Sequence, residues 1–152
     1  MRLLHVSLTA RDADALSKFF REALGFVDRR APTRLSGEHV SRGNGLPNAN
    51  IYTIWLHFPD DPGPFLEIME YNEAMERHTP AVNEPGYAHI AFEVEDLHAA
   101  IDKGLRAGGD LQGEVTNFGT HARPHLIVYV RDPEGNILEL EQPFSGEKPE
   151  IS

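Results

Sequence analysis

The chain has 152 residues, which suits one ordinary domain or two small modules that share a core. Its formal charge of −10, from 24 acidic and 14 basic residues, repels polyanions, so we expect neither nucleic acid nor an anionic membrane as a partner. The sequence has no apolar run of ~20 residues, no evident signal segment and no cysteine. We therefore expect a cytoplasmic protein in which any transition-metal site uses histidine and carboxylates.

The first elements in chain order are predicted to be a strand and a helix. Residues 3–10 alternate apolar and polar side chains, as a half-buried strand does, and His5 falls on the polar face. Asp12 stands at the N-cap position of an amphipathic helix over residues 13–24, and Gly25 ends that helix.

Three further strands are predicted before the middle of the chain. The second strand starts within residues 26–30, and the stretch 32–50, rich in Gly, Pro, Asn and Arg, is predicted to be a loop. Residues 50–58 form the next strand. The last strand covers residues 64–69, where Glu67 lies opposite its apolar neighbours. This order is β-α-β-β-β.

The second half of the chain repeats this plan. A strand histidine, a helix cap and a glycine stop recur 84 residues later, as His5 and His89, Asp12 and Asp96, and Gly25 and Gly109. Glu139 matches Glu67 at an offset of 72 residues, because the first half is longer between its helix and its last strand. Such a constant spacing indicates an internal duplication.

The predicted fold class is α+β, with two tandem β-α-β-β-β modules that form a cleft-bearing, curved mixed sheet. The first module covers residues 1–71 and the second covers residues 86–143, joined by a connection over residues 72–85. Residues 144–152 are predicted to be a polar tail, so residues 1–143 form a single domain.

Four polar side chains are predicted to converge in the cleft. Strand alternation places His5, Glu67, His89 and Glu139 on the faces that the helices leave free. Taken singly, a strand histidine or glutamate is usually packed or solvated, but the same pair at matching places in both halves favours a site. This nitrogen and oxygen set suits one divalent ion, Ni, Co, Zn, Mn or Fe. A carboxylate that loosens from the ion can serve as a general base.

Further side chains on the same face are candidates for substrate binding. Trp55, Met69 and Tyr71 would form an apolar wall, and His57 could donate or accept a proton. Ordinary packing of large side chains between sheets is the alternative explanation.

Loop residues supply weaker candidates. Arg123, and also Arg34 and Arg42, could hold a substrate carboxylate, although arginines in polar loops are usually solvated. His121 and His125 could reach a ligand, but we favour exposed loop histidines at both positions.

The chain resembles the vicinal oxygen chelate superfamily, which includes glyoxalase I, methylmalonyl-CoA epimerase, extradiol dioxygenases and antibiotic-resistance proteins. The resemblance extends from Leu3 to Gln142, and its most specific segments are 4–6, 19–20, 24–26, 86–92 and 132–140. It implies paired modules, a metal in the cleft and frequent homodimers, and in some members the site is shared across the dimer.

The ligand set is most similar to that of bacterial glyoxalase I. The resemblance implies a metal-dependent lyase or isomerase in which Glu139 and Glu67 move a proton next to a carbonyl of a small, oxygen-chelating substrate. Epimerases of the family usually have Gln at the position of Glu67. Residues 120–124 stand where some glyoxalases have a stretch of lysine and glycine, which argues against glutathione as the thiol. The alternatives are an Fe(II) extradiol-type dioxygenase and a non-catalytic binder of a small molecule such as an antibiotic or a metabolite.

Overall fold

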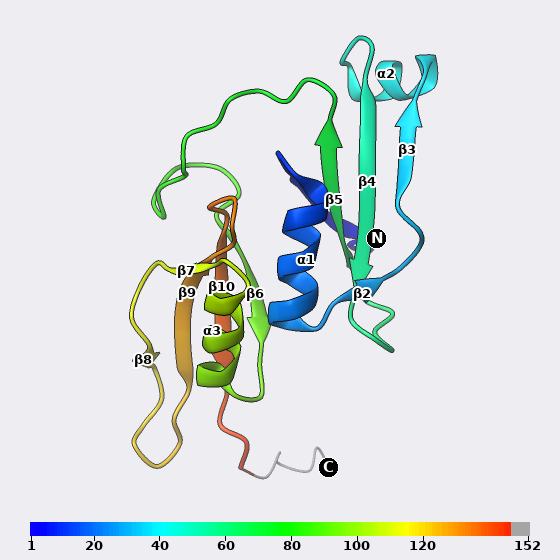
Figure 1. Cartoon of the computed structure of the whole chain (residues 1–152). Coiled ribbons are helices and arrows are strands. Elements are labelled where there is room, and N and C mark those ends of the chain that lie inside the picture. The colour runs from blue at the N-terminus through cyan, green and yellow to red at the C-terminus, as the bar shows by residue number, and fades with distance from the viewer. Residues whose placement is uncertain (147–152) are drawn as a thin grey trace. The chain divides into compact units, whose positions relative to one another are not determined.

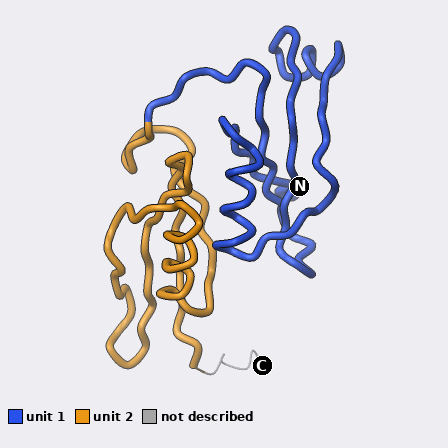
Figure 2. Tube along the Cα trace, in the orientation of Figure 1, with its two compact units in different colours: residues 1–78 blue, residues 79–152 orange. Residues whose placement is uncertain are grey.

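The computed structural model describes residues 1–146, and the chain divides into two compact units. Unit 1 comprises residues 1–78 and unit 2 comprises residues 79–152 (Figure 2). Each unit contains its own five-stranded mixed sheet and its own long helix, which confirms the predicted α+β class with one sheet in each unit.

Unit 1 contains five strands and two helices (Figure 1). Its elements are β1 (His5–Thr9), α1 (Ala13–Leu24), β2 (Val27–Asp28), β3 (Thr33–Ser36), α2 (Glu38–Asn44), β4 (Asn50–His57) and β5 (Phe65–Tyr71). The sheet order is β1-β5-β4, and both β2 and β3 pair with the outer edge of β4. β1 runs parallel to β5, whereas the other pairs are antiparallel.

Unit 2 has the same topology without a counterpart of α2. Its elements are β6 (His89–Glu93), α3 (Leu97–Arg106), β7 (Asp110–Leu111), β8 (Thr116–Asn117), β9 (Leu126–Arg131) and β10 (Ile137–Gln142). β6 runs parallel to β10, and the short strands β7 and β8 both pair with β9.

The two long helices begin in the same way. The side chain of Asp12 accepts a hydrogen bond from the amide of Ala15 over 2.8 Å, and Asp96 caps α3 through Ala99 over 2.9 Å. α1 ends at Gly25, whose φ of 77° lies in the left-handed region that glycine adopts without strain.

A second contact ties each helix start to the last strand of its unit. The amide of Ala13 donates to Oε2 of Glu70 over 2.8 Å, and the amide of Leu97 donates to Oε1 of Gln142 over 2.7 Å. These contacts occupy equivalent places in the two units, so the duplication extends to the attachment of each helix.

One face of each sheet packs against its helix. In unit 1 the core is formed by apolar side chains of α1 and of the two central strands, namely Leu16, Phe19, Phe20, Ile54, Leu56, Leu66 and Ile68. In unit 2 the most buried side chains are Leu97, Val128, Leu138 and Leu140. Burial of each large apolar side chain stabilises the fold by about 1.5–3 kcal/mol. The opposite face of each sheet carries the candidate site residues.

The region 32–50 differs from its prediction as a loop. It contains β3 and the seven-residue helix α2, which ends at Gly45 with φ 68°. The predicted second strand is also shorter than expected, because only Val27–Asp28 is a strand. β2 and β3 lie along the same neighbour, β4, and thus form one edge strand that is broken between them. The polar composition of this segment suggested that its backbone N–H and C=O groups are hydrogen-bonded to water. In the structure, pairing with β4 satisfies these groups instead.

The predicted polar tail is described only over residues 144–146, and residues 147–152 lie outside the described part of the chain. Within residues 1–146, no helix combines the length and apolar character that a membrane span requires.

Candidate metal-binding and catalytic site

Unit 1 presents a histidine–glutamate pair on its helix-free face. His5 starts β1 and Glu67 lies on the neighbouring β5, so Nε2 of His5 and Oε2 of Glu67 are 3.5 Å apart. The side chain of Glu67 is 11% exposed, whereas that of His5 is 40% exposed. The carboxylate of Glu67 is therefore largely buried, whereas the imidazole of His5 is accessible at the protein surface.

Two donors hold the carboxylate of Glu67. The indole Nε1 of Trp55 donates to Oε1 over 2.8 Å, and the hydroxyl of Ser7 donates to Oε2 over 3.1 Å. Both donors come from residues that face Glu67 across strand pairs of the sheet. A carboxylate buried to this degree needs such partners, because its desolvation is otherwise costly.

Unit 2 presents the equivalent pair. Nε2 of His89 lies 3.0 Å from Oε2 of Glu139, and the side chains are 31% and 11% exposed. Tyr129 faces Glu139 across β9 and β10 and forms a side-chain hydrogen bond with it. Trp55 and Tyr129 thus occupy the same register position in the two units, and each contributes an aromatic donor to a buried glutamate.

The surroundings of Glu139 favour its ionised form. Burial raises the pKa of Glu139, but hydrogen bonds with Glu141 and Tyr129 and the proximity of His89 and His125 outweigh burial. The pKa of Glu139 therefore lies below its ordinary value. A carboxylate at neutral pH is the state required of a metal ligand or a general base.

The two units differ beside the glutamate. The residue paired with Glu67 on β1 is Ser7, whereas the residue paired with Glu139 on β6 is Ala91, which has no side-chain donor. Glu141 lies on the same face of β10 as Glu139, and Met69 is its counterpart on β5.

His125 belongs to the surroundings of Glu139. Its Nε2 lies 2.9 Å from Oε2 of Glu141, and the side chain is 38% exposed, so the prediction of an exposed loop histidine misses this contact. Alternation could have placed Glu141 on the face of Glu139, but no pattern in the sequence links it to His125.

The donor chemistry fits a divalent ion. Each unit brings one imidazole nitrogen and one carboxylate together, and two such pairs make the set that suits first-row ions and zinc. Within residues 1–146, no three His, Asp or Glu side chains gather closely enough to hold an ion. The structure shows one pair within each unit, and the convergence of all four residues stays a prediction.

The predicted substrate-binding residues have different surroundings. Trp55 contacts Glu67. Met69 lies next to Glu67 on the same face of β5. The hydroxyl of Tyr71 approaches Oδ1 of Asn44 at the end of α2 at a distance of 3.5 Å.

His57 and Arg123 complete that set. His57 ends β4, where it pairs with Val27 of the edge strand. Arg123 is exposed in the turn before β9, and its guanidinium lies 5.2 Å from the ring centre of Phe144. No contact that the structure records for residues 1–146 links either side chain to a glutamate of the two pairs.

Two arginines near Glu67 were not predicted. The guanidinium of Arg30 lies 3.4 Å from the centre of the Trp55 ring, and that of Arg29 lies 4.6 Å from the centre of the Phe65 ring. Both lie in the segment between β2 and β3, where the break in the edge strand turns them toward the sheet. Because that break was not predicted, the sequence did not place these side chains.

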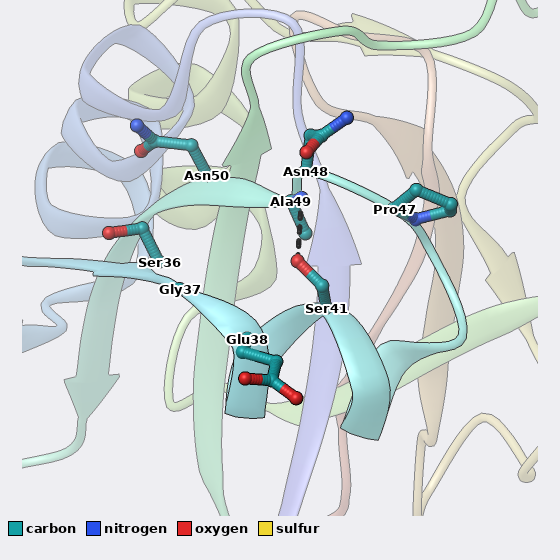
Figure 3. A pocket seen from close by; sticks show the side chains of 8 residues that line it. All are labelled: Ser36, Gly37, Glu38, Ser41, Pro47, Asn48, Ala49 and Asn50. Carbon is teal, nitrogen blue, oxygen red and sulfur yellow. Dashed lines mark hydrogen bonds between the residues drawn. The ribbon is translucent and has the colours of Figure 1, made fainter.

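A shallow hollow in unit 1 is lined by none of the residues of the histidine–glutamate pairs. Figure 3 shows its lining, which comes from α2, the loop after it and the adjacent strand ends, namely Ser36, Gly37, Glu38, Ser41, Pro47, Asn48, Ala49 and Asn50. The hydroxyl of Ser41 accepts a hydrogen bond from the amide of Ala49 over 3.1 Å across this hollow. None of the predicted site residues lines it.

Fold and site together define a class of protein with two β-α-β-β-β modules, each of which presents a histidine and a glutamate from its parallel strand pair. Residues 2–140 match the family described as the Glyoxalase/Bleomycin resistance protein/Dioxygenase superfamily. The chain belongs to this superfamily, which confirms the predicted resemblance.

Curated relatives include enzymes of two kinds. The chain is 32% identical to an ethylmalonyl-CoA/methylmalonyl-CoA epimerase of Cereibacter sphaeroides over 93% of this chain and 97% of the relative. It is 26% identical to a lactoylglutathione lyase of Neisseria meningitidis over 97% and 94%. The predicted class, an enzyme of the lyase or isomerase type, is confirmed by these relatives.

Solved structures support the fold. A glyoxalase family protein of Bacillus cereus aligns with a TM-score of 0.85 at 24% identity and covers 95% of both chains. A trypanothione-dependent glyoxalase I of Leishmania major aligns with a TM-score of 0.65 at 22% identity, over 93% of this chain and 86% of the other.

Proposed function

We propose that the chain is a metal-dependent lyase or isomerase that transfers a proton next to a carbonyl group of a small, oxygen-chelating substrate. The observation that carries this proposal is the repeated pairing of an accessible imidazole with a buried carboxylate, at 3.5 Å in unit 1 and 3.0 Å in unit 2. Evolutionary duplication alone does not require that both copies keep a buried charge. A shared chemical task explains why both do.

His5, Glu67, His89 and Glu139 would hold the ion. A divalent ion bound there supplies a Lewis acid, which makes the hydrogen next to a chelated carbonyl more acidic. The four donors can come from the two units of one chain or from two chains of a homodimer, and we propose a homodimer as the functional assembly.

Glu67 and Glu139 would be the groups that take and return the proton. The buried position of each carboxylate limits competition from water, and the aromatic donor beside it fixes its orientation. One carboxylate from each unit allows removal of a proton at one carboxylate and return at the other. Such a division of roles serves a racemising reaction at one carbon and a transfer between adjacent carbons equally well.

Two substrate classes follow from the relatives' names. A carboxylated acyl-CoA undergoes epimerisation at a single carbon, whereas the product named for lactoylglutathione lyases requires transfer between adjacent carbons of a thiol adduct. The 32% identity to the epimerase favours the first class, whereas Glu67 in place of the usual glutamine of epimerases favours the second.

Exchange of hydrogen for deuterium tests the reaction class even when the product has not been identified. The purified protein would be loaded in turn with Ni, Co, Zn, Mn or Fe and incubated in deuterated water with acyl-CoA epimers or methylglyoxal–thiol adducts. We expect metal-dependent deuterium uptake next to the carbonyl of one class. Absence of exchange with every ion and substrate would refute the proposal. Oxygen consumption with catechols would instead indicate the dioxygenase alternative.

A further inference from the structure

Two cations lie next to the candidate base of unit 1. The guanidinium carbon of Arg30 is 3.4 Å from the centre of the Trp55 ring, and the indole N–H of that ring donates to Glu67 over 2.8 Å. The guanidinium of Arg29 covers the neighbouring Phe65 at 4.6 Å, and the rings of Phe65 and Trp55 are 4.5 Å apart. A positive charge therefore lies about one indole ring away from the carboxylate of Glu67.

Arg30 is held in place but is not neutralised. Its Nη2 donates to Oγ1 of Thr53 over 3.2 Å, and that residue is fully buried and donates in turn to the carbonyl of Thr33. The Nε of Arg30 is buried without a hydrogen-bond partner, and in residues 1–146 the structure records no ion pair for Arg29 or Arg30. Over the described part of the chain, the structure records no acceptor for the Nη1 group of Arg30 and one for Nη2, so a planar anion can accept hydrogen bonds from the remaining Nη donors without reaching the buried Nε.

Only one module carries this feature. The amide of Arg29 donates to the carbonyl of Trp55 over 2.8 Å, and the amide of Gln112 donates to the carbonyl of Tyr129 over 2.9 Å, so these positions are equivalent. The residue that follows Gln112 is Gly113, which has no side chain to place over Tyr129. The arginine pair is therefore an addition to the duplicated plan rather than part of it.

We propose that Arg30, assisted by Arg29, binds a carboxylate that the substrate carries close to its reacting carbon. This inference rests on the proposed function for the role of Glu67 as a base. The substrate class is then a short acyl thioester with a carboxylate next to the acidic carbon. A chain with a net charge of −10 repels such an anion, so local cations are needed to bind it.

A carboxylate fits these residues better than a distant phosphate of a carrier does. Guanidinium binds a carboxylate through two parallel hydrogen bonds, and a guanidinium stacked on an indole ring is already oriented for that contact. The short path from Arg30 to Glu67 through Trp55 places the bound anion near the site of proton removal. A phosphate at the far end of a long carrier would lie much farther from Glu67.

Binding of two matched probes tests the proposal. The first probe is a pantetheine thioether that ends in a carboxylate, and the second is its methyl ester; neither contains phosphate. Calorimetry would measure both dissociation constants for the full-length wild type and for Arg30→Gln, Arg30→Lys and Arg29→Gln. We expect Arg30→Gln to weaken binding of the acid by about tenfold to hundredfold, with the ester unchanged. Arg30→Lys should lose less, because it keeps the charge without the fork.

Arg34 is a sequence-based candidate for holding a substrate carboxylate, but the structure pairs it with Tyr52 and places it on the other face of the same sheet, so it serves as a matched control. Its guanidinium lies 5.3 Å from the ring centre of Tyr52, whose hydroxyl donates to Asp14 of α1. Arg34→Gln should leave the ratio of acid to ester affinity unchanged. A bound metal ion would favour the acid equally in every variant, so the change in this ratio reports on the arginine alone.

The outcomes separate the two proposals. An equal loss of affinity for acid and ester in Arg30→Gln, or no loss of affinity for either, would overturn the role of Arg30. Partial misfolding of the variant does not confuse this result, because a dissociation constant does not depend on the fraction of protein that folds. Selective loss of acid binding supports the carboxylate site at Arg30 even if no deuterium exchange is found. In that case the proposed reaction fails and the carboxylate site remains.

Discussion

Trp55 donates its indole N–H to Glu67 over 2.8 Å, and the two residues face each other across β4 and β5. Tyr129 stands in the same register opposite Glu139 in unit 2. An aromatic donor beside a buried carboxylate is therefore part of the repeated design, and it gives each glutamate a defined orientation.

Replacement of either glutamate should remove activity without loss of the fold. We expect Glu67→Gln and Glu139→Gln each to lower kcat by about 10²–10⁴, because an amide neither accepts the proton nor balances the ion's charge. Steady-state kinetics on the substrate identified by deuterium exchange measures the effect, with circular dichroism as the check on folding. Glu22→Gln on the exposed face of α1 is the control. Wild-type turnover by either site variant would remove that glutamate from the mechanism.

The indole donor should matter for catalysis more than for folding. Trp55→Phe keeps an aromatic ring under Arg30 but deletes the hydrogen bond to Glu67, so we expect kcat to fall about tenfold. Tyr52→Phe is the control, since it also removes one aromatic donor from β4, but on the helix-covered face. Equal effects of the two substitutions on kcat would mean that the contact with Glu67 has no special role.

Alkaline titration should detect the contact between Tyr129 and Glu139. The hydrogen bond to Glu139, then burial and the charge of Glu141, raise the pKa of Tyr129 above its ordinary value of 10.0. This interaction stabilises the folded protein fully below the ordinary pKa and is lost as pH rises through the raised one. Tyr52 also has a raised pKa, from burial and its bond to Asp14.

Absorbance of the phenolate measures this prediction in chelator-treated protein. Of the four tyrosines, we expect two to titrate late in the wild type and one in Tyr129→Phe. Stability of the variant should also fall less steeply with pH above about 10. If the titration curve of Tyr129→Phe differs from the wild type only by one ordinary tyrosine, Tyr129 does not donate to Glu139.

Metal stoichiometry distinguishes one shared site from two separate pairs. We expect one ion per chain, and His5→Gln and His89→Gln should each weaken binding of that same ion by at least about tenfold. Elemental analysis and calorimetry measure the number and affinity of bound ions, and His98→Gln, at an exposed position on α3, is the control. Two ions per chain, each lost independently in one variant, would contradict convergence of the four ligands.

The apolar layer under α1 should dominate the stability of unit 1. Phe20 is fully buried, and its ring contacts those of Phe19 and Phe26 edge to face. We expect Phe20→Ala to lower the free energy of unfolding by about 3–5 kcal/mol. Phe118→Ala, at a position 70% exposed, should change it by less than about 0.5 kcal/mol. Urea denaturation of both variants provides the comparison.

Much of the fold could be predicted because it depends on local periodicity. α1 was predicted over its observed bounds, since the cap at Asp12 and the stop at Gly25 are chemical signals within the segment itself. The faces of His5 and Glu67 were predictable because side chains alternate along a strand whatever its partner. The sequence predicted that all four side chains meet in one cleft, whereas the structure shows one histidine–glutamate pair within each unit.

Other features depend on long-range contacts that leave no local pattern. β3 and α2 arise where a polar segment pairs with β4, and polar composition alone could not distinguish that pairing from a solvated loop. The break between β2 and β3 brings Arg30 over Trp55, 25 residues further along the chain, so no spacing rule links the two side chains. The contact of His125 with Glu141 likewise depends on where a loop enters β9.

The sequence by itself determined the duplication, the two long helices and the face on which each histidine and glutamate lies, because these follow from side-chain period and capping chemistry within short segments. Only the tertiary structure decided which groups surround the carboxylates. Strand register and the path of the edge strand, set by packing of the whole sheet, bring Trp55 to Glu67, Tyr129 to Glu139 and a guanidinium to the indole ring.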